Sequence, residues 1–284
     1  MHIETVMLDL DGTTLTPENQ VTPELNAYLK KLRSLGKRVF VITGRTEVDA
    51  LNALPSDFPH EGMVASNGMA VFAGGEKIFQ SALPSDLVQL MIRRSEEQHM
   101  YYQLHPIGGR RTILNRDKSY VIDQIQGEKP HSVGENEWNS RSQAVLEDMV
   151  WKDALTEEES AQIAKMYFFS SDPSIMDTWK QELNGLQQTF AFDQFSSSRN
   201  NVELVGRNIS KASGVRRLLD YFDLSPEHAL AIGDGENDLP MFQIAGHSAA
   251  MKNAPDHVKA QAKWVTESPY DQNGLYNFLR TIFH

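Results

Sequence analysis

The pattern that most restricts the fold is an alternation of strand and helix in the first 80 residues. An apolar run at residues 6–8 predicts a strand. Residues 22–36 predict a helix, because threonine and proline begin this segment, leucines recur at helical spacing and a glycine ends it. Further apolar runs follow at residues 38–42 and 63–65. Strands joined through a helix in this way are parallel. The sequence therefore predicts an α/β fold with a Rossmann-like parallel sheet.

This alternation is interrupted in the middle of the chain and resumes later. A predicted helix near residue 84 is followed by several short apolar runs, which are typical of an α+β unit with an antiparallel sheet. The runs lie at residues 101–104, 120–122, 166–169 and 189–192. Beyond residue 200 a helix and another strand-like run return. We therefore expect one core domain, residues 1–83 and 189–284, that contains an inserted α+β domain, residues 84–188.

The composition excludes several classes of protein. No stretch approaches the roughly 20 apolar residues of a membrane helix. The net charge of −11 and the lack of lysine or arginine runs argue against a nucleic-acid partner. The chain has no cysteine for a disulfide framework, and its first residues lack the basic and then apolar pattern of a signal peptide. We therefore expect no membrane span and a cytoplasmic location.

Polar residues follow four of the expected core strands. They are Asp9, Thr43, Asn67 after Ser66, and Asp234. Any one of these residues alone is common in the turn that follows a strand. In open α/β sheets, however, ligands bind outside the carboxyl ends of the strands, so these side chains should meet in one crevice. An unpaired aspartate at the end of a buried strand would cost several kcal/mol, roughly, unless a cation or ligand meets it.

The acidic residues near these strand ends predict a metal site. They are Asp9, Asp11, Asp234 and Asp238. Such carboxylates would repel one another without a divalent ion, and ligands that are all oxygen indicate Mg²⁺ rather than zinc. Lys211 and the hydroxyl of Thr43 add a cation and a donor that suit a phosphate group. Together these residues predict a phosphoryl-transfer centre.

Four short motifs resemble, in order, those of the haloacid dehalogenase (HAD) superfamily. They are residues 9–13 (Asp-Leu-Asp-Gly-Thr), residues 43–45 (Thr-Gly-Arg), Lys211, and residues 233–238 (Gly-Asp-Gly-Glu-Asn-Asp). The insertion between the second and third motifs, with Ser-Asn-Gly at residues 66–68, is similar to the Cof-type branch with a C2B cap. Two departures are Ala212, where glycine commonly follows the lysine, and Met-Lys-Asn-Ala at residues 251–254, where Met-Gly-Asn-Ala is more usual.

The resemblance implies a role for each matching residue in the chemistry. Asp9 is the nucleophile that forms an aspartyl-phosphate, and it also binds Mg²⁺. Asp11 is the general acid and then the general base, and its backbone carbonyl is a metal ligand. Asp234 completes the metal ligands of the protein. Asp238 orients metal-bound water or Lys211.

The resemblance also implies a phosphate-binding set. It consists of Thr43, the backbone N–H groups of Leu10 and Gly44, Lys211 and Asn237. Two nearby residues have simpler interpretations. Asn67 fits a tight turn before Gly68 as well as it fits a catalytic role. Arg45 is expected to be a solvated residue at a helix start, in preference to the alternative of a substrate contact.

The leading hypothesis is a Mg²⁺-dependent phosphatase that hydrolyses a small phosphomonoester, with a sugar phosphate as the expected substrate class. The insert is expected to close over the site as a lid and to set specificity. Two alternatives stay open: a phosphomutase or phosphotransferase with the same intermediate, and a phosphate-ligand sensor without catalysis. The sequence identifies neither the physiological substrate nor the oligomeric state.

Overall fold

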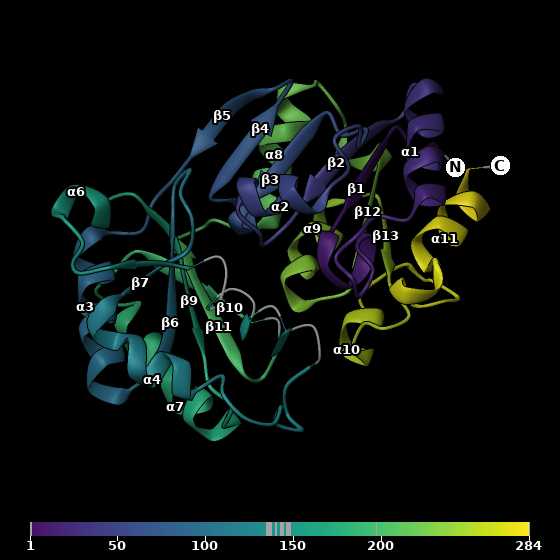
Figure 1. Ribbon diagram of the computed structural model, residues 1–284. Helices are drawn as coiled ribbons and strands as arrows, with labels where there is room; N and C mark the ends of the chain where they lie inside the picture. The colour runs from purple at the N-terminus through teal and green to yellow at the C-terminus, as the bar shows by residue number, and fades with distance from the viewer. Residues whose placement is uncertain are drawn as a thin grey trace. The chain divides into compact units, whose positions relative to one another are not determined.

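The chain forms two compact units in the computed structural model, which describes residues 2–134, 138, 139, 141, 142, 145, 149–196 and 198–283. One unit contains the segments up to Gln80 and from Ile209 onward, and the other contains Ser81–Asn208 (Figure 1). Among the helices in these described ranges, none is long and apolar enough to cross a membrane.

The first unit is a sheet with helices on both faces. Its strands are β1 (Thr5–Leu8), β2 (Arg38–Ile42), β3 (Gly62–Ala65), β4 (Ala70–Ala73), β5 (Glu76–Gln80), β12 (Ala229–Gly233), β13 (His247–Ala250) and β14 (Trp264–Val265). Its helices are α1 (Pro23–Ser34), α2 (Glu47–Ala53), α8 (Lys211–Tyr221), α9 (Leu239–Ile244), α10 (Asp256–Lys259) and α11 (Gly274–Ile282).

The strand order of this sheet is β14-β13-β12-β1-β2-β3-β4-β5. The six strands from β14 to β3 are parallel, and β4 and β5 add an antiparallel edge. Strand β1 lies between β12 and β2, with Leu8 beside Ile232 on one side and Val41 on the other. The structure thus confirms the predicted parallel α/β core, and it brings the carboxyl ends of β12, β1 and β2 next to one another.

Both faces of the sheet are buried, which explains the nearly continuous apolar strands. Val6, Leu8 and Val41 pack with α1, α2 and α11, whereas Met7 and Phe40 on the opposite face pack with α8, α9 and α10. Helices α1 and α11 lie in contact (Figure 1).

Local signals set the ends of α1 as expected. The hydroxyl of Thr22 accepts the N–H of Leu25 at 3.3 Å, Pro23 is the first helical residue, and Gly36 follows the helix with φ of 82°. A positive φ costs glycine little, so the chain can leave the helix there and enter β2.

The second unit is a six-stranded sheet packed against helices. Its strands are β6 (Tyr101–Pro106), β7 (Thr112–Leu114), β8 (Val150–Lys152), β9 (Ile163–Phe169), β10 (Phe192–Phe195) and β11 (Asn201–Gly206). Its helices are α3 (Ser85–Gln98), α4 (Lys118–Asp123), α6 (Glu157–Ser160) and α7 (Pro173–Leu186). The order is β10-β11-β9-β6-β7-β8, and all pairs are antiparallel except β7 with β8.

The expected boundary after residue 188 is wrong, because the second unit continues to Asn208. Strand β11 pairs with β9, with Asn201 beside Phe169, and β10 pairs with β11. Backbone hydrogen bonds therefore hold residues 192–195 and 201–206 in the sheet of the second unit. The order of elements along the chain did not indicate this pairing.

Two of the short apolar runs were expected to be strands, but the structure places most of their residues outside strands. Residues 120–122 lie in α4, because a run of three apolar residues fits a helix turn as well as a strand. Of residues 189–192, only Phe192 is in a strand. The N–H of Thr189 donates to the carbonyl of Leu186 at 2.9 Å, so these residues extend the turn that ends α7.

Candidate active site

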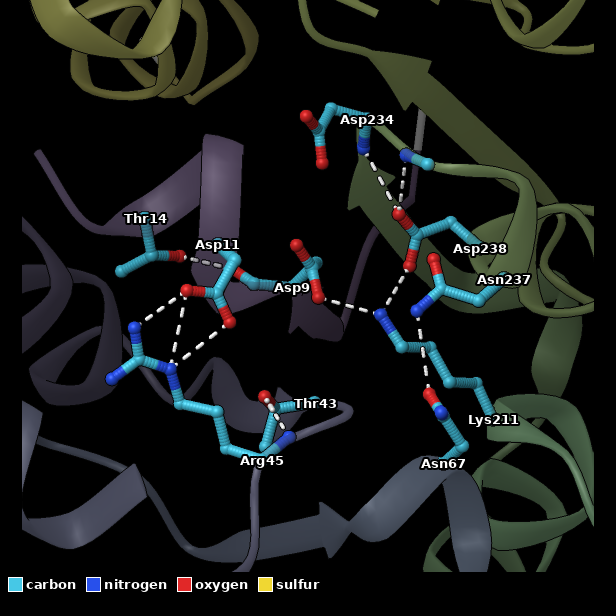
Figure 2. A network of polar contacts seen from close by, with 11 residues as sticks. Asp9, Asp11, Thr14, Thr43, Arg45, Asn67, Lys211, Asp234, Asn237 and Asp238 are labelled. Carbon is cyan, nitrogen blue, oxygen red and sulfur yellow. Dashed lines mark hydrogen bonds and ion pairs between the residues drawn. The ribbon is translucent and has the colours of Figure 1, made fainter. Parts of the chain in front are cut away.

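The predicted site residues of the first unit come together at the carboxyl ends of neighbouring strands. Asp9 follows β1, Thr43 follows β2, Asn67 follows β3 and Asp234 follows β12. Lys211 is the first residue of α8, which packs on one face of the sheet. Residues that are far apart in the sequence therefore form one polar network (Figure 2).

The centre of the network is a buried lysine between two carboxylates. Lys211 Nζ donates to Oδ1 of Asp9 at 2.5 Å and to Oδ1 of Asp238 at 2.6 Å. The lysine side chain is 0% exposed. Burying these charges is tolerable only because each one meets an opposite charge at hydrogen-bond distance.

The cluster carries more negative than positive charge. Carboxylate oxygens of Asp9, Asp234 and Asp238 lie within 4.8 Å of one another. These three carboxylates face the single ammonium of Lys211, so two negative charges remain, which a divalent cation would balance. All the donors in this group are oxygens, and they fit Mg²⁺.

The pKa values show the same imbalance. Burial raises the pKa of Asp9 to about 8; the charge of Lys211 opposes this rise, whereas Asp238 and Asp11 add to it. Burial, and then the charge of Asp9, raise the pKa of Asp234 well above its usual range. Burial alone would lower the pKa of Lys211, but the charges of Asp238 and Asp9 outweigh it and raise this pKa. Without a metal ion, the raised pKa values favour protonated carboxyls at this site. A bound cation would instead favour their ionised form.

Asp238 supports the site through hydrogen bonds. Its Oδ2 accepts the backbone N–H groups of Asp234 and Gly235, both at 2.9 Å, while its Oδ1 accepts Lys211. One carboxylate therefore fixes both the loop after β12 and the lysine. This geometry fits the orienting role that the resemblance implies for Asp238.

Asp234 is held by a residue that the sequence interpretation missed. Asn253 Nδ2 donates to Oδ2 of Asp234 at 3.0 Å and to the carbonyl of Gly12 at 2.9 Å. Asn253 belongs to the Met-Lys-Asn-Ala segment at residues 251–254, in which lysine stands where glycine is more usual. Gly12 has φ of 71°, and a Cβ there would lie 2.1 Å from Asp234 Oδ2. Only glycine therefore lets this carboxylate approach the first motif.

The first motif turns sharply after Asp9. Residues Leu10–Thr14 form a single π-type turn, closed by the N–H of Leu15 donating to the carbonyl of Leu10 at 2.9 Å. Thr14 Oγ1 donates to the carbonyl of Asp9 at 2.5 Å. These two hydrogen bonds hold the turn that carries Asp11 directly after Asp9.

Arg45 is not the solvated residue that the sequence suggested. Its side chain is 18% exposed, and it forms a forked contact with Asp11: Nε donates to Oδ2 at 3.0 Å and Nη2 to Oδ1 at 2.5 Å. Figure 2 shows the Asp11 carboxylate turned toward Arg45, whereas Asp9 faces Lys211. Arg45 therefore fixes the direction of Asp11.

Thr43 and Asn67 also belong to this polar network (Figure 2). Thr43 Oγ1 accepts the backbone N–H of Arg45 at 3.0 Å, which leaves its own proton to donate. Asn67 has φ of 55°, so it does occupy the tight turn, and its Oδ1 also accepts Nδ2 of Asn237 at 3.3 Å. A Cβ on Gly44 would lie 3.2 Å from Oδ1 of Asn67. Phosphate binding by Thr43, Asn237 and the N–H groups of Leu10 and Gly44 stays a prediction.

The fold and the site together define a class of protein. The family model described as haloacid dehalogenase-like hydrolase matches residues 6–279. The chain belongs to this family and is a hydrolase. The predicted resemblance is confirmed.

The matches to related proteins cover nearly the whole chain. A 5-amino-6-(5-phospho-D-ribitylamino)uracil phosphatase of Bacillus subtilis, YwtE, is 25% identical over 292 residues, which cover 96% of both proteins. The structure of a haloacid dehalogenase-like hydrolase from B. subtilis has a TM-score of 0.81 and 20% identity, and it covers 99% of this chain and 100% of that one. A HAD subclass IIB sugar phosphatase has a TM-score of 0.77 and 20% identity over 98% of both chains. These structures share the fold.

Proposed function

We propose that the protein is a Mg²⁺-dependent phosphatase that hydrolyses a small phosphomonoester through an aspartyl-phosphate on Asp9. The observation that carries this proposal is the buried group of Asp9, Asp234 and Asp238 around Lys211, which has two negative charges in excess. Asp9 and Asp234 would hold the ion, together with the backbone carbonyl of Asp11. When bound, Mg²⁺ supplies positive charge that neutralises the carboxylates and attracts phosphoryl oxygens.

The first chemical step joins Asp9 to the substrate. A carboxylate oxygen of Asp9 attacks phosphorus, and the bond from phosphorus to the alcohol oxygen breaks. Asp11 donates a proton to that oxygen, so the alcohol leaves neutral. Arg45 directs the Asp11 carboxylate, and we propose that it sets the position from which the proton is delivered.

The second step releases phosphate. Asp11, now ionised, takes a proton from water, whose oxygen attacks phosphorus and displaces the Asp9 carboxylate. Lys211 and the hydroxyl of Thr43 place positive charge and a donor beside the phosphoryl group. Lys211 is already fixed by Asp238, so little reorganisation is needed during the reaction.

A sugar phosphate is the proposed substrate class. Two relatives support it by name, a sugar phosphatase and a phosphatase of a phosphorylated ribityl compound. We propose that the second unit, Ser81–Asn208, selects among such esters. No nucleic-acid or membrane partner is proposed, and the cytoplasm stays the expected location.

The test is hydrolysis of a generic aryl phosphate by Asp9→Asn. This variant keeps the shape of the side chain but removes the nucleophile, so turnover should fall to background. Asp256→Asn, a change at a fully exposed aspartate, is the matched control and should retain wild-type activity. Undiminished hydrolysis by Asp9→Asn would contradict the assignment.

A panel of phosphorylated sugars and nucleotides then defines the substrate. Each assay should be run with and without an added sugar acceptor, and both free phosphate and the phosphorylated sugars should be measured. Release of phosphate supports a phosphatase. Transfer to the acceptor without free phosphate would support the phosphotransferase alternative instead.

A further inference from the structure

A second group of metal-binding side chains lies at the other end of the same strands. His2 and Glu4 precede β1, and His228 precedes β12, whereas Asp9 and Asp234 follow these strands. At 3.3 Å per residue, Glu4 is about 16 Å along the chain from Asp9. The two groups are therefore separate sites.

The backbone brings this second group together. In an extended chain, residues two apart point to the same side, so His2 lies beside Glu4. Thr5 pairs with Ala229 in the register of β1 with β12, and the N–H of Glu4 donates to the carbonyl of His228 at 2.8 Å. Glu4 and His228 are thus held next to each other by the sheet itself, with or without a ligand.

The side chains converge on one point. His2 Nε2 is 2.7 Å from Glu4 Oε1, and His228 Nδ1 is 3.5 Å from Glu4 Oε2. The two imidazole rings contact each other edge to face, with centroids 4.6 Å apart. One donor atom from each of the three side chains lies within 4.8 Å of the others. Donors around one tetrahedral zinc are about 3.3 Å apart. His2 is exposed and Glu4 and His228 are partly exposed, so small rotations of these side chains would suffice.

The donor chemistry differs from that of the active site. Two imidazole nitrogens and one carboxylate oxygen suit zinc and its neighbours in the transition series, whereas Mg²⁺ prefers oxygen alone. Without a metal, a proton on each ring nitrogen must lie between imidazole and carboxylate. A metal ion in that place would bind all three lone pairs at once.

We propose that His2, Glu4 and His228 form a binding site for a transition-metal ion of the zinc class, separate from the active site. Three protein ligands leave at least one coordination position for water. The bound ion joins the segment before β1 to the segment before β12, the two strands that carry Asp9 and Asp234 at their far ends.

The test is calorimetric titration of tag-free, full-length protein with Zn²⁺, with excess Mg²⁺ present to occupy the active-site carboxylates. One zinc should bind per chain. His228→Gln and Glu4→Gln should each weaken zinc binding about tenfold or more, because each removes one of three ligands. Far-ultraviolet circular dichroism of each variant confirms that it is folded.

The matched control is His257→Gln. His257 and Glu236 form an exposed pair at 2.9 Å, like His2 and Glu4. No second imidazole joins that pair in any group of three metal ligands among the described residues. This substitution should leave zinc binding unchanged. Anomalous diffraction at the zinc edge from soaked crystals should place the ion between His2, Glu4 and His228.

Two outcomes would overturn the proposal. One is zinc affinity that is the same in His228→Gln, Glu4→Gln and the wild type. The other is zinc binding that is lost in Asp234→Asn but kept in His228→Gln, which would place the ion at the active site.

Discussion

Removing divalent cations should make the stability of this protein depend strongly on pH. The buried Asp9 carboxyl has a pKa of about 8 in the folded chain, against an ordinary value of 3.8. The folded state therefore holds this proton more tightly than the unfolded chain does, and this favours folding in acid. The contribution is fully present below pH 3.8 and is lost as the pH rises to about 8.

The size of the effect follows from the two pKa values. Each pKa unit corresponds to about 1.4 kcal/mol, so the free energy of unfolding should fall by about 3.5 kcal/mol between pH 5 and pH 8 because of Asp9. Asp234, whose pKa is also raised, should change stability in the same direction. Saturating Mg²⁺ should remove most of this loss, because the cation stabilises the ionised carboxylates.

Urea unfolding at pH 5 and pH 8, with EDTA and with Mg²⁺, measures these free energies. Asp9→Asn is the matched control, because its amide does not titrate. The difference between wild type and variant measures the contribution of Asp9 together with its effect on the pKa of Asp234. A wild-type protein in EDTA that loses no more stability than Asp9→Asn over this range would refute the reasoning, as would a loss that Mg²⁺ does not reverse.

Substitutions at three further positions test the network around the site. Lys211→Met should lower kcat by about 10²- to 10³-fold in a steady-state assay, because it removes the cation beside the nucleophile. Asn253→Ala should weaken Mg²⁺ binding about tenfold by calorimetry, since Asp234 loses the amide that orients it. Arg45→Ala should lower kcat about tenfold through Asp11, and Arg45→Lys should not restore it, because an ammonium cannot make the forked contact. Wild-type kinetics or affinity in any one of them would contradict the role assigned to that residue.

The core of the fold was predictable because local and long-range signals agree there. The helix from Pro23 has its cap, its apolar face and its terminating glycine in sequence order, and the strands around it are apolar on both faces. The inserted unit lacked such signals. Residues 201–204 pair with β9 through backbone contacts between distant segments, which no local pattern reveals, so the expected boundary fell too early.

The members of the site were also predictable, but the directions of their side chains were not. The positions of Asp9, Thr43 and Asp234 at the ends of strands predicted that these residues would meet. They did not tell that Arg45 would reach Asp11, because Arg45 and Asp11 are separated by a helix and a strand. Asn253 was missed for a similar reason: its segment follows β13, and its amide reaches the site only through the fold of the loops.

Two aspartates in one motif illustrate how hydrogen bonds decide the role of a carboxylate. The two oxygens of Asp238 accept the N–H groups of Asp234 and Gly235 and the ammonium of Lys211, so little lone-pair capacity is left for a metal. Asp234 is oriented by the amide of Asn253 and retains capacity toward Asp9. Although both residues lie in the acidic group, the ion should bind between Asp9 and Asp234. Asp238 should then lie outside the set of metal ligands. Accordingly, Asp234→Asn should abolish Mg²⁺ binding. Asp238→Asn should still bind Mg²⁺, but with lower affinity, and its kcat should fall because Lys211 is displaced.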